Sequence, residues 1–411
     1  SQLVPPHDKN VIDEVKKVQV SDIKFEGVPE MITILGKNFD KKYLDKVKTL
    51  SLSPEAIQKE HDLKIVFTPL HGTTYELVPA SLRNWGFTNI HTVPEQSIPN
   101  GDFPTVASAN PEEPAAFKMA LDLARKIDAD LAMACDPDGD RIGIAVKNDA
   151  GEWTLLNGNQ TNIIFTEYII RRKKELNQLK GGEYTVKTIV TTELIKDIAE
   201  KNHIICYDVY TGFKWIADVI RKEGGEKFIG GGEESFGYMP GAFTRDKDGV
   251  SATSLMAEIA AWVKMQNKTL YSFLKEIYAK YGFSQERMIY IVRKGLSGAQ
   301  EIKAMMEEFR HNTPKEINHS PVVLKKDYLS LEATNLQTGE KTHLNFETKS
   351  DVLQFFLADG SKISVRPSGT EPKIKFYFEA RAQMKDVNEY ERAQQEANAR
   401  IDAIIKDLKL Q

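Results

Sequence analysis

The sequence has few cysteines, no long apolar run and no excess of charge of one sign, and each of these features argues against one class of protein. The two cysteines, Cys135 and Cys206, are too few for a disulfide framework and predict buried thiols in a reducing compartment such as the cytoplasm. No apolar run approaches the roughly 18 residues that a membrane-spanning helix requires. The net charge of −4 provides no basic field to attract nucleic acid or a membrane surface.

What remains is an ordinary globular composition, with 41% hydrophobic and 28% charged residues. A length of 411 residues suggests two to four domains. Strand and helix patterns alternate from residue 63 to 177, and alternate again from residue 183 to 229. From residue 285 onward, strands dominate before a last helix at 386–409. The pattern predicts an α/β fold in which two repeated α/β domains with mixed sheets precede a smaller C-terminal α+β domain.

An acidic loop follows the apolar run at residues 131–134. It places Asp136, Asp138 and Asp140 at every second position, and alternate side chains of extended backbone share a face roughly 6.5–7 Å apart. Three neighbouring carboxylates repel one another unless a cation neutralises them, which predicts a hard divalent cation, Mg²⁺ above all. Arg141 adds a guanidinium group suited to a phosphate.

The same acidic loop could be a solvated turn, and two other kinds of site use similar aspartate spacing. A calcium EF-hand starting at Asp136 needs Gly at its sixth position and Glu at its twelfth, but Arg141 and Lys147 stand there, which excludes it. A phosphatase of the haloacid dehalogenase type, with Asp136 as nucleophile, also has Asp-x-Asp after an apolar strand. That family usually has Thr or Val at the position of Asp140, yet it stays the main rival on these residues alone.

A second polar loop, at residues 230–237, follows a predicted strand and reads Gly-Gly-Gly-Glu-Glu-Ser-Phe-Gly. Its glycines let a ligand approach the backbone closely, and Glu233 and Ser235 supply the acceptors and donor that sugar hydroxyls need. Taken alone, a flexible turn with an incidental pair of glutamates is the simpler interpretation. Cations in nearby segments favour an anionic ligand: Lys214, Arg245 and Lys247.

A third loop follows the strand predicted at 362–365 and reads Arg-Pro-Ser-Gly-Thr-Glu-Pro-Lys from Arg366 to Lys373. It has the parts of a phosphate cradle: a guanidinium, two hydroxyls and a glycine that exposes backbone N–H groups. Its two prolines lower the cost of ordering the loop around a ligand. A proline-bounded turn explains the same residues without a ligand.

Two further residues are predicted to have structural roles. His71, in a loop after the strand at 64–67, is expected to stabilise the local backbone. Ser53, followed by Pro54, is expected to cap the start of a helix.

Together and in this order, the three loops resemble those of the α-D-phosphohexomutases, the phosphoglucomutase/phosphomannomutase family. The resemblance covers the chain from about residue 60 to 411, and the rival phosphatases lack the two later loops. It implies four domains around a cleft, the first three with an α/β core of mutase type. A phosphoserine in domain one would donate its phosphoryl group to a sugar phosphate, and a sugar 1,6-bisphosphate would return the other. The Glu-Glu-Ser-Phe-Gly sequence favours glucose over mannose, with pentose still open.

The resemblance also implies roles for individual residues. Asp136, Asp138 and Asp140 would hold one Mg²⁺ per chain against the phosphoserine, and Arg141 would contact its phosphate. Lys247 would serve as general acid or base. The residues implied to bind the sugar phosphate are Lys214, Glu233, Ser235, Arg245, Arg366, Ser368, Gly369 and Thr370.

One family feature has no counterpart in these 411 residues, namely the Thr-Ala-Ser-His-Asn-Pro type segment that carries the nucleophile. The segment 108–111 resembles it superficially, but its place before a domain-two helix matches a family Asn-Pro-Glu motif. The sequence therefore predicts a C-terminal portion of a mutase that is inactive alone. The predicted domains are a remnant of domain one with a linker (1–38), a metal-loop α/β domain (39–182), a sugar-binding α/β domain (183–297) and a phosphate-binding α+β domain (298–411).

Two alternatives to a mutase remain on the sequence. One is a natural sugar-phosphate-binding protein without catalysis. The other is a metal-dependent phosphatase that uses Asp136. The sequence does not predict an oligomeric state.

Overall fold

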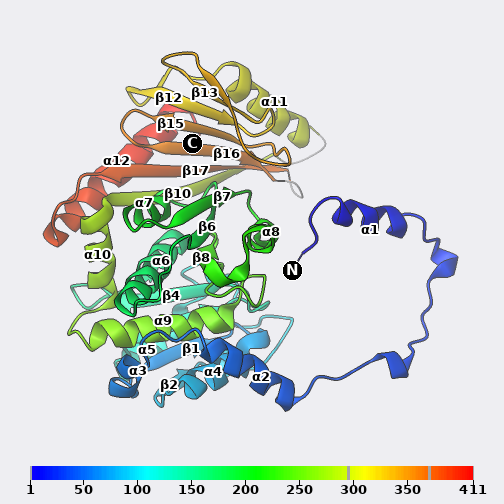
Figure 1. The fold of residues 1–411 in the computed structure, drawn as a ribbon, viewed down its shortest axis with the longest axis vertical. Coiled ribbons are helices and arrows are strands. Elements are labelled where there is room, and N and C mark those ends of the chain that lie inside the picture. Colours follow the sequence, from blue (N-terminus) through cyan, green and yellow to red (C-terminus); the bar gives the residue numbers. More distant parts are fainter. Residues whose placement is uncertain (1, 294–296, 369–371, 411) are drawn as a thin grey trace. The chain divides into compact units, whose positions relative to one another are not determined.

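A computed structural model of the chain describes residues 2–293, 297–368 and 372–410 (Figure 1). The chain divides into two compact units, a first unit at Ser1–Leu274 and a second unit at Lys275–Gln411. Across the described ranges, none of the helices combines the length and the apolar character that a bilayer span requires.

The first sheet of the first unit has five strands in the order β2-β1-β3-β4-β5. Its strands are β1 (Ile65–Thr68), β2 (Ile90–Thr92), β3 (Leu131–Cys135), β4 (Ile142–Lys147) and β5 (Trp153–Leu156). The strand β1 pairs in parallel with β2 and β3, whereas β4 and β5 continue the sheet antiparallel. Every residue of β3 is buried, so the acidic loop leaves the sheet from a fully enclosed strand.

The helices around this sheet are α2 (Lys37–Lys48), α3 (Pro54–Lys59), α4 (Leu77–Trp85) and α5 (Lys118–Ile127). The helix α5 buries Ala120 and Ala124 in a core cluster that also contains Val66 and Phe117. Small residues at this helical spacing allow α5 to lie close to β1 and β3, which it contacts.

A second sheet in the first unit has the order β7-β6-β8-β9. Its strands are β6 (Tyr184–Thr188), β7 (Ile205–Val209), β8 (Phe228–Gly232) and β9 (Tyr238–Met239), with helices α6 (Gly158–Glu175), α7 (Leu194–Lys201) and α8 (Phe213–Glu223). The strand β6 pairs in parallel with β7 and β8, and β9 is antiparallel to β8. The carboxyl ends of β6 and β8 therefore open on one edge, where ligands of parallel sheets ordinarily bind.

The helix α9 (Gly249–Lys264) links the two sheets of the first unit. It is buried from Gly249 to Val263 and contacts β3 and β4 of the first sheet and β9 of the second. Its amino end thereby lies where residues from both sheets meet.

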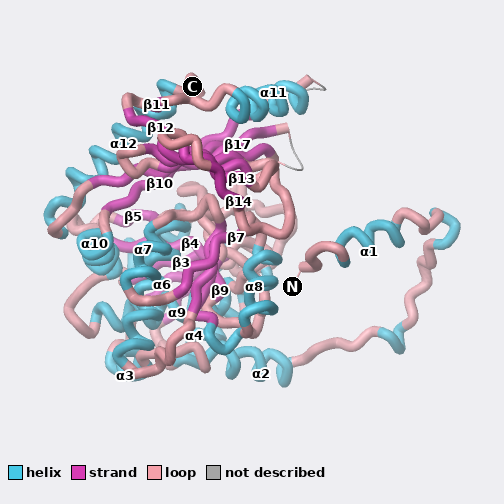
Figure 2. Tube along the Cα trace, turned by 45° about the horizontal axis from the view of Figure 1, so that its top comes forward, coloured by secondary structure: helices cyan, strands magenta, loops and turns pink. Residues whose placement is uncertain are grey.

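The second unit is built on an antiparallel sheet whose main path is β10-β17-β16-β15-β12-β13-β14 (Figure 2). Its strands are β10 (Phe283–Val292), β11 (Glu316–Ile317), β12 (Ser320–Asp327), β13 (Glu332–Asn335), β14 (Lys341–His343), β15 (Leu353–Leu357), β16 (Lys362–Pro367) and β17 (Lys373–Ala382). The helices are α10 (Leu270–Tyr281), which begins in the first unit, α11 (Gly298–His311) and α12 (Tyr390–Asp407). The helix α12 packs on β17 and β10.

Short 3₁₀ segments complete the described structure, at Val20–Asp22, Pro29–Met31, Thr73–Tyr75, Pro94–Gln96, Gly225–Lys227 and Val387–Glu389. The chain before α2 contains one helix, α1 (His7–Val15), and no residue from 2 to 39 is buried. Large apolar side chains in this segment are exposed, including Phe25 (88%) and Ile34 (86%). The segment therefore adds nothing to the core of the first unit.

The structure confirms the predicted fold class and corrects several details. The hydroxyl of Ser53, which was expected to cap a helix, makes no capping bond to α3. Instead, Ser53 accepts a hydrogen bond from the hydroxyl of Tyr168, because packing against α6 competes with local capping. The strand β10, placed by sequence before the boundary at 297, pairs along ten residues with β17 in the C-terminal sheet.

Candidate functional site

The acidic loop turns sharply at the carboxyl end of β3. A carboxylate oxygen of Asp136 accepts hydrogen bonds from the backbone N–H groups of Asp140 and Arg141, at 3.0 Å each. Gly139 has a φ of +76°, which favours glycine, and a Cβ there would lie 2.7 Å from the side chain of Thr74. The loop is therefore held in one shape by its own first aspartate.

A neighbouring loop supports the acidic loop from the side. Gly72 lies so close that a Cβ would come within 2.2 Å of the Cα of Pro137, and Thr73 donates its backbone N–H to the Pro137 carbonyl at 3.0 Å. The ring nitrogens of His71 lie 3.1 Å from the Ile98 carbonyl and 2.8 Å from the Thr105 hydroxyl. The predicted structural role of His71 is confirmed, because both ring nitrogens are used within this loop region.

The three aspartates of the acidic loop differ in burial and in their partners. Asp136 is buried, whereas Asp138 is exposed and has no hydrogen-bond or ion-pair partner within the described ranges. Asp140 forms an ion pair with the ammonium of Lys247 at 2.8 Å. In the part of the chain that the structure describes, no group of three or more acidic, histidine or cysteine side chains is spaced to hold a metal ion. The assignment of Asp136, Asp138 and Asp140 as metal ligands therefore stays a prediction.

Burial dominates the electrostatics of Asp136. It raises the pKa of this carboxyl to about 6, and the nearby charge of Asp140 acts in the same direction. The backbone N–H of Arg141 opposes the shift by bonding the ionised form. The first carboxylate of the loop is therefore partly protonated in mildly acidic solution.

Arg141 is held by carboxylates on two sides. Its Nη1 donates to Glu112 at 3.0 Å, and its Nε lies 3.7 Å from Asp136 and 3.9 Å from Asp140. The Nε is buried and has no hydrogen-bond partner within the described ranges. Sequence reasoning missed Glu112, although it belongs to the Asn-Pro-Glu segment, because nothing local signals a pairing with Arg141.

The Glu-Glu-Ser loop begins where β8 ends. Glu233 is buried, and its carboxylate accepts the backbone N–H of Gly212 at 2.6 Å. The carboxylate of Glu234 faces the hydroxyls of Thr188 and Thr191, at 3.2 and 3.1 Å. Ser235 is partly exposed, and in the described structure its hydroxyl makes no hydrogen bond to the protein. The loop thus combines fixed carboxylates with one hydroxyl that is available to a ligand.

Backbone pairing joins the acidic loop to the Glu-Glu-Ser loop. Arg141 and Gly237 form an antiparallel β-bridge, and Ile142 donates its N–H to the Phe236 carbonyl at 3.0 Å. At the start of α9, the Gly249 N–H donates to the Gly139 carbonyl at 3.0 Å. The acidic loop, the Glu-Glu-Ser loop and the start of α9 therefore meet at one place in the first unit. We call this place the junction, and it is formed by Gly139, Arg141, Ile142, Phe236, Gly237 and Gly249.

The predicted cations differ in how they relate to the junction. Lys247 belongs to it: its ammonium pairs with Asp140, and its aliphatic chain fills the space that a Cβ on Gly237 would occupy. The guanidinium of Arg245 instead donates to the Ala242 carbonyl at 2.8 Å. The ammonium nitrogen of Lys214, near the start of α8, lies 3.8 Å from a carboxylate oxygen of Asp8. No described contact brings Arg245 or Lys214 to the acidic loop.

Sequence reasoning also missed a hydrogen-bonded pair next to Lys247 in the chain, formed by the partly buried Tyr43 and the buried Asp248. Asp248 caps α9 by accepting the N–H groups of Val250 and Ser251, and the same oxygen accepts the hydroxyl of Tyr43 at 2.7 Å. The other oxygen of Asp248 is buried without a hydrogen-bond partner. Burial and the neighbouring carboxylate raise the pKa of Tyr43. Tyr43 therefore ties α2 to the residue beside Lys247.

The predicted phosphate loop belongs to the second unit. Arg366 lies in β16, opposite Lys375 of β17, and no described carboxylate pairs with its guanidinium. Ser368 donates its backbone N–H to the Lys373 carbonyl at 2.8 Å, which closes the base of the loop. Gly369 and Thr370 lie outside the described residues.

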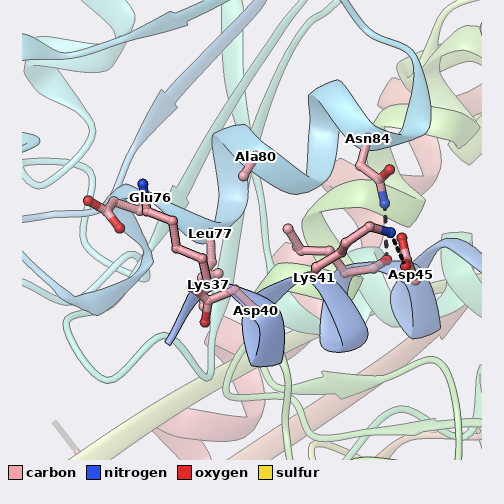
Figure 3. Close-up of a pocket in the computed structure, with 9 residues that line it drawn as sticks. Lys37, Asp40, Lys41, Asp45, Glu76, Leu77, Ala80 and Asn84 are labelled. Atoms are coloured by element: carbon pink, nitrogen blue, oxygen red, sulfur yellow. Dashed lines mark hydrogen bonds and ion pairs between the residues drawn. The ribbon is translucent and has the colours of Figure 1, made fainter. Parts of the chain in front are cut away.

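A separate hollow of about 330 Å³ lies between α2 and α4 (Figure 3). Leu77 and Ala80 of α4 line it, and Lys41 forms an ion pair with Asp45 at 2.6 Å across one turn of α2. The amide of Asn84 donates to a carbonyl of α2 at 3.2 Å. None of the predicted site residues lines this hollow, so it is not part of the candidate site.

Comparisons with known proteins match the same regions of the chain. Family descriptions of phosphoglucomutase/phosphomannomutase match at residues 41–151 (alpha/beta/alpha domain II), 157–281 (alpha/beta/alpha domain III) and 309–397 (C-terminal domain). The domain III match begins at residue 157 and so includes α6, which the sequence assigned to the preceding domain. This agrees with the packing of α6 on β8 and α7.

Curated relatives include phosphoglucomutases of Staphylococcus aureus strains. The phosphoglucomutase of strain N315 is 38% identical over 317 residues, which is 77% of this chain. The match covers 56% of that relative's length, so the chain spans little more than half of the proteins it matches.

Solved structures show the same fold at lower identity. The phosphoglucomutase pp63/parafusin from Paramecium gives a TM-score of 0.60 at 17% identity, covering 91% of this chain and 61% of that one. A phosphoglucomutase/phosphomannomutase family protein from Burkholderia thailandensis gives 0.55 at 15% identity, covering 87% and 64%. With three consecutive family domains matched and a relative at 38% identity, the chain belongs to the phosphoglucomutase/phosphomannomutase family.

Proposed function

We propose that this chain is the metal- and substrate-binding part of a phosphoglucomutase-type phosphohexomutase. The whole enzyme would be an intramolecular phosphotransferase of the isomerase class that interconverts sugar 1-phosphate and 6-phosphate through a phosphoserine and a bisphosphate. The observation that carries the proposal is the junction, where the Arg141–Gly237 bridge joins the acidic loop to the Glu-Glu-Ser loop. Phosphoryl transfer depends mainly on positioning and charge neutralisation, and the residues of the junction would supply both.

The donor chemistry of the acidic loop fits a hard divalent cation. Asp136, Asp138 and Asp140 offer only oxygen ligands, and Asp138 has no protein partner within the described ranges. When bound, Mg²⁺ would neutralise negative charge on a phosphoryl group. Arg141 would contribute its buried Nε, which has no hydrogen-bond partner within the described ranges, to the same group, because a guanidinium is a fixed donor for phosphate oxygens.

The chain's own side chains would do the remaining work on the sugar phosphate. Lys247 would hold or release a proton at its Nζ, as a general acid or base for the hydroxyl that gains or loses the phosphoryl group. Glu233, whose carboxylate is fixed by the Gly212 N–H, would orient sugar hydroxyls together with Ser235. The further substrate contacts that we propose are Lys214, Arg245, Arg366, Ser368, Gly369 and Thr370.

The 411 residues alone are expected to give no turnover, because they contain no Thr-Ala-Ser-His-Asn-Pro type segment to carry the phosphoserine. The matches to domains II, III and the C-terminal domain support this view. The exposed apolar side chains between residues 18 and 39 support it further, since a run of this kind ordinarily has a partner surface. A sugar 1,6-bisphosphate is the proposed intermediate and activator, with glucose as the preferred sugar.

A coupled assay tests the proposal. The product of the complete gene and the 411-residue chain are each supplied with glucose 1-phosphate, mannose 1-phosphate or ribose 1-phosphate in the presence of Mg²⁺. We expect conversion by the complete product, fastest with glucose 1-phosphate, and none by the 411-residue chain. Conversion by the 411-residue chain would refute its assignment as an inactive part.

The two alternatives predict different results. If the reading frame upstream encodes no serine segment and the complete product binds sugar phosphate without converting it, the protein is a binding protein. If phosphate release occurs and a phosphoaspartate can be trapped at Asp136, the protein is a phosphatase.

A further inference from the structure

A second hollow in the first unit, of about 500 Å³, lies at the opposite end of β8 from the Glu-Glu-Ser loop, and we call it the rear pocket. Its walls come from the end of α2 and the following loop, from α6, from the start of β8 and from the turn at 240–243. Phe228, the first residue of β8, lines it, whereas Glu233 follows the last residue of that strand. Five strand residues span about 17 Å, so this rear pocket is distinct from the junction.

The rear pocket has both apolar and polar walls, and two lysines are among its polar residues. Ile169, Phe228 and Leu255 supply apolar wall, and Lys46 and Lys173 supply ammonium groups. Within the described ranges, neither ammonium forms an ion pair, although that of Lys46 lies 5.9 Å from the ring centre of Phe243. An ammonium beside apolar walls without a carboxylate is less favourable than a paired one.

Lys173 is the less solvated of the two lysines. It is half-buried, and burial lowers its pKa, with the charge of Glu183 opposing the shift. The one carboxylate that lines the rear pocket belongs to Glu226, which is exposed and therefore screened by water.

The partial negative charge at the carboxyl ends of α2 and α6 does not account for the positions of Lys46 and Lys173 in the rear pocket. The helices α2 and α6 both end there, and their last carbonyls carry partial negative charge. Each last turn carries a further cation besides the pocket lysine, Lys48 on α2 and Arg172 and Lys174 on α6, so the helix ends do not by themselves require a lysine in the pocket. Lys173 differs from Lys174 because its side chain enters the pocket.

We infer that the rear pocket binds a small organic anion, with a phosphate or carboxylate group at Lys173 and an apolar or ring-shaped body against Ile169, Phe228 and Leu255. The anion would give Lys173 the direct ion pair that it does not form within the described ranges, and its body would remove apolar wall from water. Lys46 would approach the same anionic group from the open side. This inference does not depend on the proposed mutase activity.

Methyl NMR on the complete 411-residue chain tests the inference with phenyl phosphate as the ligand. Isoleucine and leucine methyl groups are labelled, and shifts of Ile169 and Leu255 report on the rear pocket separately from the junction and from Arg366. We expect saturable shifts at both residues, with benzyl alcohol as a neutral analogue producing far smaller ones. Lys173→Met should weaken phenyl phosphate binding about tenfold or more, because it removes a charge-assisted contact.

Two variants serve as controls. Lys174→Met removes a neighbouring charge outside the pocket and should leave the affinity within about twofold, whereas Lys173→Arg keeps the charge and should retain binding. Unshifted Ile169 and Leu255 methyls would overturn the inference. So would equal affinities of the wild type and Lys173→Met, or equal shifts from the neutral analogue. A methyl NMR spectrum of Lys173→Arg that is typical of a folded protein ensures that the conclusion does not depend on the stability of Lys173→Met alone.

Discussion

The ammonium of Lys247 lies 2.8 Å from a carboxylate oxygen of Asp140, so the proposed acid–base residue neutralises a proposed metal ligand. Lys247 immediately precedes the capping residue of α9, and Asp140 ends the turn after β3. The Gly249–Gly139 hydrogen bond holds the two segments together. A divalent cation on Asp140 therefore competes with Lys247 for the same carboxylate.

Replacing Lys247 should strengthen metal binding. Lys247→Met removes the competing ammonium but keeps the side chain that packs against Gly237. A partly exposed ion pair contributes up to about 1 kcal/mol, so the affinity for Mg²⁺ should rise by about two- to fivefold. Isothermal titration of the 411-residue chain with MgCl₂ measures this. Lys214→Met is the matched control and should leave the Mg²⁺ affinity unchanged; a weaker affinity in Lys247→Met would contradict the competition.

Metal binding should also depend on pH through Asp136. Burial raises its pKa from 3.8 to about 6, so folding gains stability from this group at low pH and loses it as the pH rises through about 6. Metal binding has the opposite dependence, because it needs the ionised carboxylate. Mg²⁺ affinity should therefore fall as the pH is lowered through about 6.

Titrations with MgCl₂ on either side of that pH test the assignment, with Asp136→Asn as the comparison. The variant should bind Mg²⁺ weakly at every pH and lack the inflection. An unchanged inflection in Asp136→Asn would assign the pH dependence to another group.

The Tyr43–Asp248 hydrogen bond should matter both for stability and for the position of Lys247. Tyr43→Phe removes a donor to a buried carboxylate, which should cost about 1.5–3 kcal/mol of unfolding free energy. The change should also perturb the NMR signal of the Lys247 ammonium, because Asp248 is its neighbour in the chain. Tyr75→Phe, at a tyrosine that is 39% exposed, is the control and should change neither quantity. A stable Tyr43→Phe protein with an unshifted Lys247 signal would show that Tyr43 does not position the junction.

The close approach of α9 to the acidic loop should tolerate no side chain at Gly249. A Cβ there would lie 2.7 Å from the Gly139 carbonyl oxygen and 3.0 Å from the sulfur of Cys135. Gly249→Ala should destabilise the protein by about 1–3 kcal/mol and weaken Mg²⁺ binding. Urea denaturation measures the first effect. Gly101→Ala is the matched control, because nothing lies within 4 Å of the added carbon. Similar urea unfolding midpoints for Gly249→Ala and Gly101→Ala would argue against a tight contact at Gly249.

Local sequence was enough to predict the acidic loop and its place at a strand end. An apolar run followed by alternating aspartates with Pro137 and Gly139 has one natural conformation, a buried strand that leads into a sharp turn. The different burial of Asp136 and Asp138 could not be predicted, because the shape of the turn depends on which backbone N–H groups the Asp136 carboxylate accepts.

Side-chain pairs between residues that are far apart in the sequence could not be predicted, for a different physical reason. The pairs Arg141–Glu112 and Asp248–Tyr43 form only because packed helices and loops bring distant segments together. Nothing at either position in the sequence specifies its partner. Ser53 illustrates the same point, since its predicted capping bond is replaced by a contact with Tyr168.

Binding of glucose 1,6-bisphosphate to the 411-residue chain in the presence of MgCl₂ tests the central claim most directly. The claim is that the chain holds the metal- and substrate-binding groups of a mutase while lacking its phosphoserine. Isothermal titration should detect binding to one site per chain, and Glu233→Ala and Arg366→Ala should each weaken it about tenfold or more. No binding by the wild-type chain, or unchanged binding by both variants, would contradict the account.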